Sequence, residues 1–402
     1  MKISLKRTPE QIELIKAMAS KNRSVAYEAQ VALAEFIGPV IAEVINNAPV
    51  LSNLFTPLQF NSEDNPSIPL DLYYDVTDED YVQVYSNSVA GGLPQNQVVP
   101  TVSELKVATY SLDTAVSFDR RYAAKSRMDV VSKTFTRMAQ EILLKQEKTS
   151  ATMIMSALAN ATTNNEKHII RSAQAGRFLL SDLNKLFTKA KRINTAWNGG
   201  TPAERRGRGI TDILVSPEIV EEIRGLAYNP INTIGGAGGA PTAGDGIAAT
   251  DSMRDAVFNS AGIPEFYGVS ILEFNEMGAG QKWNTVFGTA ASGKTFADNY
   301  SVQQNGGTEF GFAAQIDNSS PADADYDDAG DVDASGEQII VGVDLSRESM
   351  IRAIATDSES GEEFSLIADD QFATRQSKIG YYGSLEEGRM IIDDRVLLGL
   401  IV

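Results

Sequence analysis

Residues 114–142 read TAVSFDRRYAAKSRMDVVSKTFTRMAQEI and join an alternating segment to a helical one. Around its first half, Leu112, Thr114, Val116 and Phe118 recur at every second position and so share one face, which is the period of a half-buried strand. The run from Pro100 to Gly176 encloses 75 residues without a single glycine or proline. Because turns depend on these two residue types, the stretch predicts an extended strand followed by one long helix.

The predicted helix covers about residues 123–160 and would be roughly 50 Å long. Two apolar stripes follow its helical period, one of Val131, Phe135, Met138 and Ile142 and one of Met153, Ile154, Ala157 and Leu158. The polar residues 145–150 separate the two stripes, whereas a coiled coil would keep a continuous apolar seam. We therefore expect a single helix that is buried at both ends and exposed to water in the middle.

A long hairpin is predicted ahead of this helix. Residues 67–86 alternate with period two, residues 101–118 form the return limb, and the tip between them is rich in turn-forming residues. Residues 61–103 hold seven acidic residues and no lysine or arginine. Because an isolated two-stranded hairpin is marginally stable in water, we expect this one to lie on another surface.

The remaining periodicities predict a mixed α+β fold. The helix over 8–20 opens on Thr8-Pro9-Glu10-Gln11, a capping sequence with proline at the first helical position. A second helix over 24–47 contains Gly38-Pro39, which should kink or split it. A third, over 180–196, is expected to be capped at Ser181. Further predicted elements are a strand at 210–215, a helix from 217 to 224, and strands at 266–274, 283–287, 338–343 and within 379–402.

Composition excludes several classes of protein. The chain has 402 residues, a net charge of −18 and no cysteine, so disulfides and thiolate metal sites are impossible and binding by neutralising nucleic-acid phosphates is disfavoured. No signal peptide and no membrane-length apolar segment is visible. Residues 113–210 carry eighteen basic residues against eight acidic ones, and residues 295–346 carry eleven acids and no base. Alternating blocks of this size suggest that copies of the chain meet, acidic surface to basic surface.

One motif points to an alternative function. Residues 288–295, GTAASGKT, match the phosphate-binding loop pattern GxxxxGK[ST], in which Lys294 would reach the phosphates and Thr295 would hold Mg²⁺. Such a loop must open a helix, yet the residues after Thr295 lack apolar periodicity. A divergent P-loop ATPase is therefore the alternative to a structural protein.

Other candidate chemistry is weak. The acidic residues of 323–333 resemble a calcium loop, but no register supplies both the glycine and the final glutamate of an EF-hand. A solvent-exposed acidic loop is the simpler interpretation, and calcium binding by 317–337 stays open. His168 is the only histidine, so histidine-based triads and imidazole metal clusters are excluded. The basic segments 189–192 and 205–208 favour acidic protein partners over phosphate.

The order of parts resembles the major capsid proteins of tailed bacteriophages, the Hong Kong ninety-seven-type capsid fold. The strongest likeness is residues 114–122 running into residues 128–142, where the return strand of an extended loop meets a spine helix. Ile213-Leu214-Val215-Ser216-Pro217-Glu218 and the closing strands of 379–402 are also similar to the family. The resemblance lies in pattern and order and covers most of the chain.

The resemblance implies a division into domains. Residues 1–60 would be an N-terminal arm and 61–112 the extended loop (E-loop). The peripheral domain would comprise 113–210 and 345–402, with the spine helix over 126–160. Residues 211–344 would form the axial domain, with an insertion at about 289–338. Because the loop has no lysine between Asn61 and Ser103, the lysine crosslinking of some members is not expected, and the short segment before the loop suggests a separate scaffold or little processing.

The resemblance also implies a structural, non-enzymatic protein without a cofactor. It would assemble into pentamers and hexamers around double-stranded DNA, in a virion assembled in the host cytoplasm. Scaffolding, portal and decoration proteins would be its partners, the packaged DNA would be bound non-specifically, and no membrane would be involved. The predicted contact between copies joins the acidic loop residues to a neighbour's basic strip. These residues are Asp71, Asp75, Asp78, Glu79 and Asp80 on the loop, and Arg120, Arg121, Lys125, Arg127 and Arg137 on the strip.

Overall fold

The computed structural model describes residues 8–47, 50–69, 104–163, 166–172, 178–193, 209–225, 269–278, 281, 283, 303–305, 308–310, 338–356, 363–369 and 378–402. The chain divides into two compact units. The first comprises residues 1–69, 103–151 and 350–390, and the second comprises residues 70–102, 152–349 and 391–402. Each unit contains a five-stranded sheet, and the mixed α+β class predicted from the sequence is confirmed.

The sheet of the first unit is organised around its longest strand, β15 (Lys378–Ile391). Over residues 378–388 β15 pairs antiparallel with β4 (Thr109–Asp119), and over 380–384 it also pairs with β14 (Ser365–Asp369). β13 (Met350–Thr356) follows in the sheet order and pairs in parallel with β1 (Thr56–Asn61). The return limb predicted from alternation is thus confirmed as β4.

Two helices at the start of the chain pack against this unit. α1 spans Pro9–Met18, and the Thr8 side chain accepts a hydrogen bond from the backbone N–H of Gln11 at 3.3 Å, which confirms the predicted cap. α2 spans Arg23–Asn47 and contains Pro39. The helix is therefore not split at this proline, which was one of the two outcomes expected there. Burial of Ile37 and Ile41 on either side of it stabilises the helical backbone, and such tertiary packing can outweigh the lost hydrogen bond.

Two helices follow β4 where the sequence predicted one. The short α3 (Arg120–Ala124) is capped by Asp119, and the long α4 (Met128–Asn160) begins after a three-residue break. Ser126 in that break has a φ of 52°. This left-handed conformation ends α3 and redirects the chain into α4.

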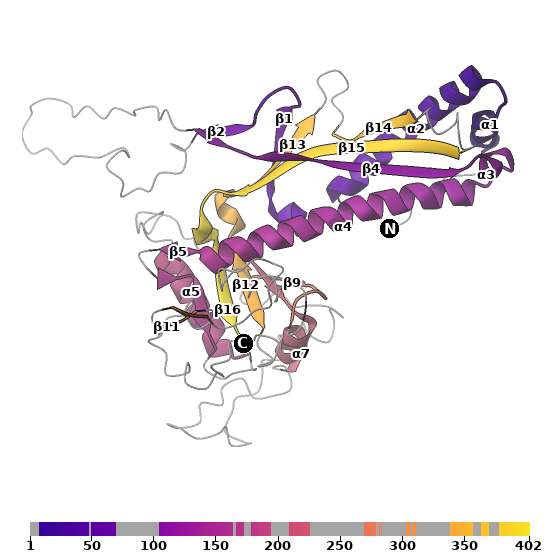
Figure 1. Ribbon diagram of the computed structural model, residues 1–402. Helices are drawn as coiled ribbons and strands as arrows, with labels where there is room; N and C mark the ends of the chain where they lie inside the picture. Colours follow the sequence, from indigo (N-terminus) through magenta and orange to yellow (C-terminus); the bar gives the residue numbers. More distant parts are fainter. Residues whose placement is uncertain are drawn as a thin grey trace, which may run out of the picture. The chain divides into compact units, whose positions relative to one another are not determined.

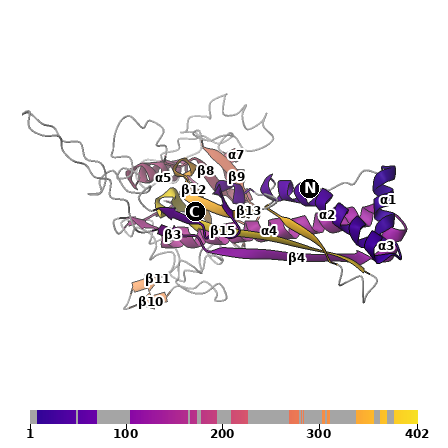
Figure 2. The same ribbon diagram turned by 90° about the horizontal axis from the view of Figure 1, so that it is seen from above.

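The N-terminal part of α4 lies alongside β4 and β15 (Figures 1 and 2). Its predicted stripe of Val131, Phe135, Met138 and Ile142 is buried, as expected. Phe135 meets Tyr381 of β15 edge-on, with ring centroids 5.2 Å apart. The water-exposed middle predicted for this helix is only partly right, because Lys145 and Lys148 are exposed whereas Gln146 and Ser150 are fully buried.

The base of the predicted hairpin is also present. β2 (Ser67–Pro69) and β3 (Glu104–Lys106) pair antiparallel, with Ile68 opposite Leu105. The chain therefore leaves and re-enters the first unit at one place. The residues between these strands, 70–103, lie outside the described part of the chain.

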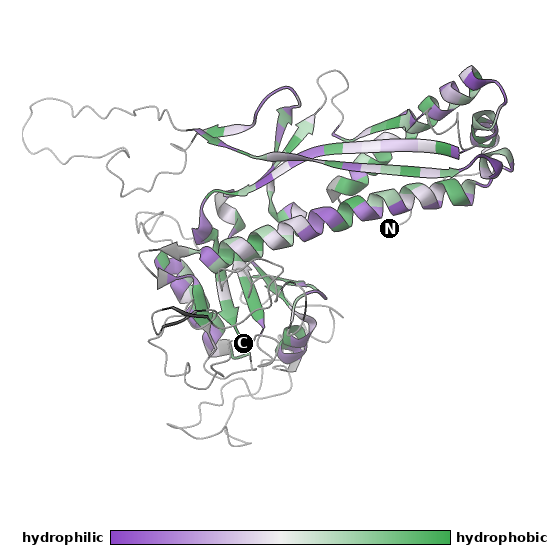
Figure 3. Ribbon diagram, in the orientation of Figure 1, coloured by the Kyte–Doolittle hydropathy of each residue, from purple (hydrophilic) through white to green (hydrophobic). Residues whose placement is uncertain are grey.

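The second unit has the sheet order β7-β16-β12-β8-β9. All residues of β12 and β16 are buried, and both strands are strongly hydrophobic in Figure 3. Core residues from α5 and α7 pack with this sheet. The bounds of these elements are Ile169–Arg171 (β7), Leu397–Ile401 (β16), Ile339–Val343 (β12), Asp212–Val215 (β8), Ser270–Glu273 (β9), Leu180–Ile193 (α5) and Pro217–Gly225 (α7).

The predicted cap of α5 at Ser181 is wrong, since the helix already begins at Leu180. The backbone N–H of Asp182 donates to the carbonyl oxygen of Leu179, so the first turn forms one residue earlier. Leu183, Leu186, Ala190 and Ile193 of α5 are buried, and Phe187 is partly buried against the same core. The remaining short elements are η1 (Ser52–Leu54), η4 (Leu345–Arg347), η5 (Asp394–Val396), β5 (Thr162–Thr163), β6 (Glu166–Lys167), β10 (Gln303–Asn305) and β11 (Thr308–Phe310).

Candidate functional site

The predicted basic strip is only partly a free surface. Arg121, Lys125, Arg127 and Arg137 are exposed, and the first three cluster at α3 and the break that follows it. Arg120 is half-buried, and its Nε and Nη2 donate to the carbonyl oxygen of Ala19 at 3.3 and 3.1 Å. Arg120 therefore fastens α3 to the end of α1. The five predicted acidic partners, residues 71–80, lie outside the described residues.

A pocket of about 280 Å³ opens beside Arg120, and we call it the basic pocket. Its basic lining residues come from three places: Lys21 and Arg23 at the α1–α2 junction, Arg120 at the start of α3, and Lys378 at the start of β15. None of its lining residues is acidic. The full lining is Met18, Ser20, Lys21, Arg23, Ala26, Tyr27, Gln30, Arg120, Lys378 and Ile379.

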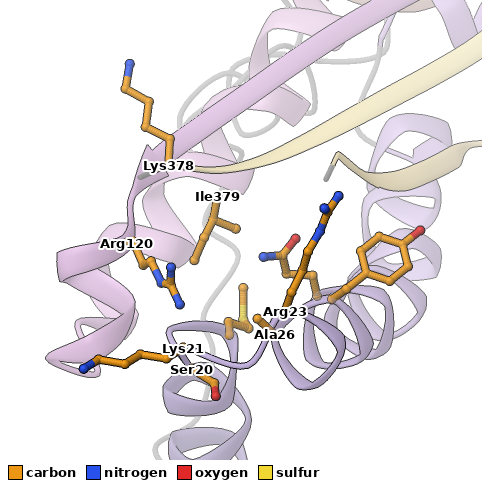
Figure 4. Close-up of a pocket in the computed structure, with 10 residues that line it drawn as sticks. Ser20, Lys21, Arg23, Ala26, Arg120, Lys378 and Ile379 are labelled. Carbon is orange, nitrogen blue, oxygen red and sulfur yellow. The ribbon is translucent and has the colours of Figure 1, made fainter. Parts of the chain in front are cut away.

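The basic side chains do not converge on one point. In Figure 4, Lys21 and Lys378 extend away from the pocket in different directions, whereas the Arg120 guanidinium points toward the α1–α2 junction. Sequence reasoning missed Lys21, Arg23 and Lys378, because residues separated by up to 357 positions carry no local pattern. Only the packing of the α1–α2 junction against the start of β15 brings them together.

The first unit also buries a charged cluster that the sequence did not indicate. Glu387 of β15 is fully buried, and its Oε2 accepts hydrogen bonds from Nε of Arg352 and Nε2 of Gln146, both at 3.1 Å. Its Oε1 accepts from the Tyr110 hydroxyl at 3.0 Å and from Arg389 Nη1. One carboxylate thus joins β4, α4, β13 and β15.

This cluster explains why Gln146, in the polar middle of α4, is buried. Gln146 donates to Glu387, and Glu147 accepts the backbone N–H groups of Val50 and Leu51 at 2.7 and 3.1 Å. Burial raises the pKa of Tyr110 to about 12, so its hydroxyl remains protonated and donates to Glu387. Burial also lowers the pKa of Arg352, against the effect of the neighbouring Glu387. The arrangement is structural, because buried polar groups are stable only when they are hydrogen-bonded.

His168 is a second buried polar group, in the second unit. Its Nδ1 lies 3.1 Å from the carbonyl oxygens of both Asp394 and Leu397. Since both neighbours are acceptors, Nδ1 carries the hydrogen and donates. Burial lowers the pKa of the imidazole. The role of His168 is therefore to hold the chain ahead of β16 in place. This structural role is compatible with the sequence analysis, in which histidine-based triads and imidazole metal clusters were excluded.

The lowered pKa predicts acid sensitivity of the second unit. The imidazole of a histidine in an unfolded chain titrates near pH 6.5. Below that pH, His168 binds a proton in the unfolded chain more readily than in the folded chain. The free energy of unfolding therefore falls as the pH drops through the folded-state pKa. We expect the free energy of unfolding, followed by tryptophan fluorescence from Trp197 and Trp283, to decrease between pH 7.5 and 5.5. His168→Asn keeps an N–H donor without titrating and should remove its share of this decrease. An identical pH profile for the two proteins would contradict the assignment.

The motifs for alternative chemistry cannot be placed. The P-loop-like residues 288–295, the acidic loop 317–337 and the basic segment 205–208 all lie outside the described residues. Within the described part of the chain, no group of three or more histidine, aspartate or glutamate residues is arranged to hold a metal ion. Among the same residues, no helix has the length and apolar character needed to cross a bilayer.

ATP binding that is lost in Lys294→Ala would support the ATPase alternative.

Comparison with known proteins gives similarities of fold. No protein-family profile and no curated sequence matches the chain. Among solved structures, the capsid of a native GTA particle is 12% identical over 89% of this chain and 90% of that chain, with a TM-score of 0.45. The mature capsid of bacteriophage PhiM1 is 10% identical over 88% and 86%, with a TM-score of 0.42. An encapsulin complex from Synechococcus elongatus is 11% identical over 75% and 76%, with a TM-score of 0.36.

Proposed function

We propose that this chain is the structural subunit of an icosahedral viral capsid, which assembles into pentamers and hexamers that enclose double-stranded DNA. One observation carries the proposal. Within the first unit, the β2–β3 pair, which flanks the acidic segment 70–103 in the sequence, lies at one end of the long β4–β15 pair, and α3 with its exposed basic residues follows the other end. Such a head-to-tail distribution of opposite charges favours heterologous contacts, which generate rings when the rotation between neighbouring copies closes.

In this proposal the chain performs no catalysis and needs no cofactor. Its main partner is itself, with scaffolding, portal and decoration proteins and the packaged DNA as further partners. It resides in the virion after assembly in the host cytoplasm. The assignments of N-terminal arm, E-loop, peripheral domain and axial domain, with the boundaries given above, are part of the same proposal. Electron microscopy of the purified protein tests it: closed shells or capsomers support it, and isolated monomers at all concentrations contradict it.

The proposed contact between copies predicts an effect of charge reversal. Arg121→Glu with Lys125→Glu should prevent assembly, because the reversed charges would repel the acidic loop of a neighbour. These two exposed residues are better targets than Arg120, whose replacement would also break its hydrogen bonds to Ala19. Assembly is measured by sedimentation and electron microscopy, and folding by circular dichroism.

The matched control is Lys133→Glu with Lys145→Glu, which makes the same charge change at two exposed positions of α4. We expect this control to assemble. If the Arg121/Lys125 variant assembles as well as the control, the proposed pairing is wrong even though the chain remains a shell protein.

A further inference from the structure

We propose that the basic pocket binds single-stranded nucleic acid, with one base inside the pocket and the phosphates on either side of that base held by the basic residues. The net charge of −18 disfavours phosphate binding over the chain as a whole, so such a site has to be local. The pocket meets this condition, because four basic residues and no acidic residue line it. The proposed function does not depend on this site, and electron microscopy of the wild-type protein tests that function separately.

The basic residues are placed for a strand of phosphates and not for one small anion. In Figure 4, Lys21 and Lys378 extend in different directions, whereas a single oxyanion needs donors that converge on one point. A nucleic-acid strand carries one phosphate per nucleotide, so the phosphates that flank a bound base reach cations on different sides of the pocket. Each of these contacts is charge-assisted.

Arg120 is positioned before any ligand binds. Its Nε and Nη2 donate to the carbonyl oxygen of Ala19, which uses two of the five N–H donors of a guanidinium and leaves the others for a phosphate. The nearest acidic residue in the strand register is Asp119, opposite Lys378. Asp119 accepts the backbone N–H of Arg121 as the cap of α3 and does not line the pocket.

The interior of the pocket is suited to the flat ring of a base. Met18, Ala26 and Ile379 are buried and contribute apolar surface to the lining. Tyr27 also lines the pocket and is 41% exposed. An accessible aromatic side chain beside a basic groove is the combination with which proteins bind single strands, because the base stacks on the ring while the backbone follows the cations.

Gln30 is an unsatisfied polar group in the same pocket. It is only 3% exposed, and its amide oxygen accepts no hydrogen bond from any group in the described part of the chain. An unsatisfied buried acceptor is costly. The pairing edge of an unpaired base carries donors as well as acceptors and can satisfy this amide, whereas in a duplex that edge is already paired. A fully ionised phosphate brings no donor. Gln30 therefore favours a single strand over both a duplex and a small anion.

Fluorescence anisotropy with a labelled single-stranded DNA of about ten nucleotides tests the site. We expect the full-length chain to bind this strand about tenfold more tightly than an abasic strand of the same length or the same sequence as a duplex. Equal affinity for the abasic strand would mean that only phosphates are recognised and would overturn the proposal, as would tighter binding of the duplex. Adenosine monophosphate or a glutamate-rich peptide that competes equally at the same molar concentration would overturn the choice of ligand.

Removing charge from the pocket locates the bound strand. Lys21→Gln with Lys378→Gln should weaken binding about tenfold at low salt. It should also reduce the slope of log affinity against log salt concentration by about 1.4, or about 0.7 for each lost phosphate contact. Circular dichroism checks that the variant is folded.

The matched control for the pocket variant is Lys133→Gln with Lys145→Gln, which removes the same charge from two exposed positions of α4. We expect this control to keep the affinity and the salt dependence of the wild-type protein. Equal effects of the two double substitutions would assign the binding to general surface charge and overturn the pocket assignment.

Gln30→Met separates a role in binding from a role in folding. Methionine is also unbranched but lacks the amide, so the loss of an unsatisfied buried acceptor should leave the urea midpoint unchanged or raise it. Binding of the normal strand should weaken about fivefold, and binding of the abasic strand should not change, because only the base contacts the amide. An unchanged ratio of the two affinities would contradict the placement of the base beside Gln30.

Discussion

Replacing Glu387 by glutamine should destabilise the first unit by about 3–5 kcal/mol, because it leaves two buried guanidinium groups without their counter-charge. Glu387 is fully buried, and Arg352 and Arg389 are 3% and 5% exposed. All three side chains interact through the one carboxylate. Urea denaturation followed by far-ultraviolet circular dichroism measures the loss as a lower midpoint.

The matched control for this prediction is the neighbouring residue. Glu386→Gln changes the same functional group on the same strand, but Glu386 is only half-buried, so we expect a change within about 0.5 kcal/mol. A combined Glu387→Leu, Arg352→Met and Arg389→Met variant should recover much of the stability, since replacing a whole buried ionic cluster by apolar residues is often neutral. Equal stabilities of the Glu387 and Glu386 variants would show that the cluster does not hold the unit together.

Phe135→Ala should destabilise the same unit by about 3–5 kcal/mol through the loss of apolar contacts and the cavity left behind. The Phe135 ring is fully buried in the core that α4 forms with β15. Its edge-on contact with Tyr381, at 64° between the ring planes, adds to the stabilisation from burial. The measurement is again the urea midpoint of the circular dichroism signal.

Leu144→Ala is the control for Phe135, because it truncates an apolar side chain on the same helix at a position that is 55% exposed. We expect a change within about 0.5 kcal/mol, since alanine is also the better helix former. A loss of stability at Leu144 comparable to that at Phe135 would mean that a different face of α4 is buried.

Local patterns predicted the elements better than their junctions. Period-two alternation identified β4, and helical spacing identified the buried stripe of α4, because each side chain's direction follows from its position in a regular backbone. The break between α3 and α4 was missed, since nothing in the local sequence requires the left-handed conformation of Ser126. The sequence left open whether α2 continues through Pro39, because tertiary packing, not propensity, decides it.

The candidate site was predicted only in its general character. The alternating charge blocks indicated contacts between copies and included Arg120, Arg121 and Lys125. They gave no sign that Arg120 bonds to Ala19. They also did not indicate that Lys21, Arg23 and Lys378 share one pocket with it. Charge counts describe composition along the chain, whereas a pocket depends on which distant segments meet.

The sequence by itself determined the class of the fold, the order of its main elements, the acidic and basic blocks, and the face that α4 buries. These properties depend on residues close together in the chain, whose periodicity and composition are visible directly. Only the tertiary structure decided that Gln146 and Ser150, in the polar middle of α4, are buried. Gln146 there is stabilised by Glu387, which lies 241 positions away. The basic pocket is another tertiary feature, because it exists only where the α1–α2 junction, α3 and β15 come together.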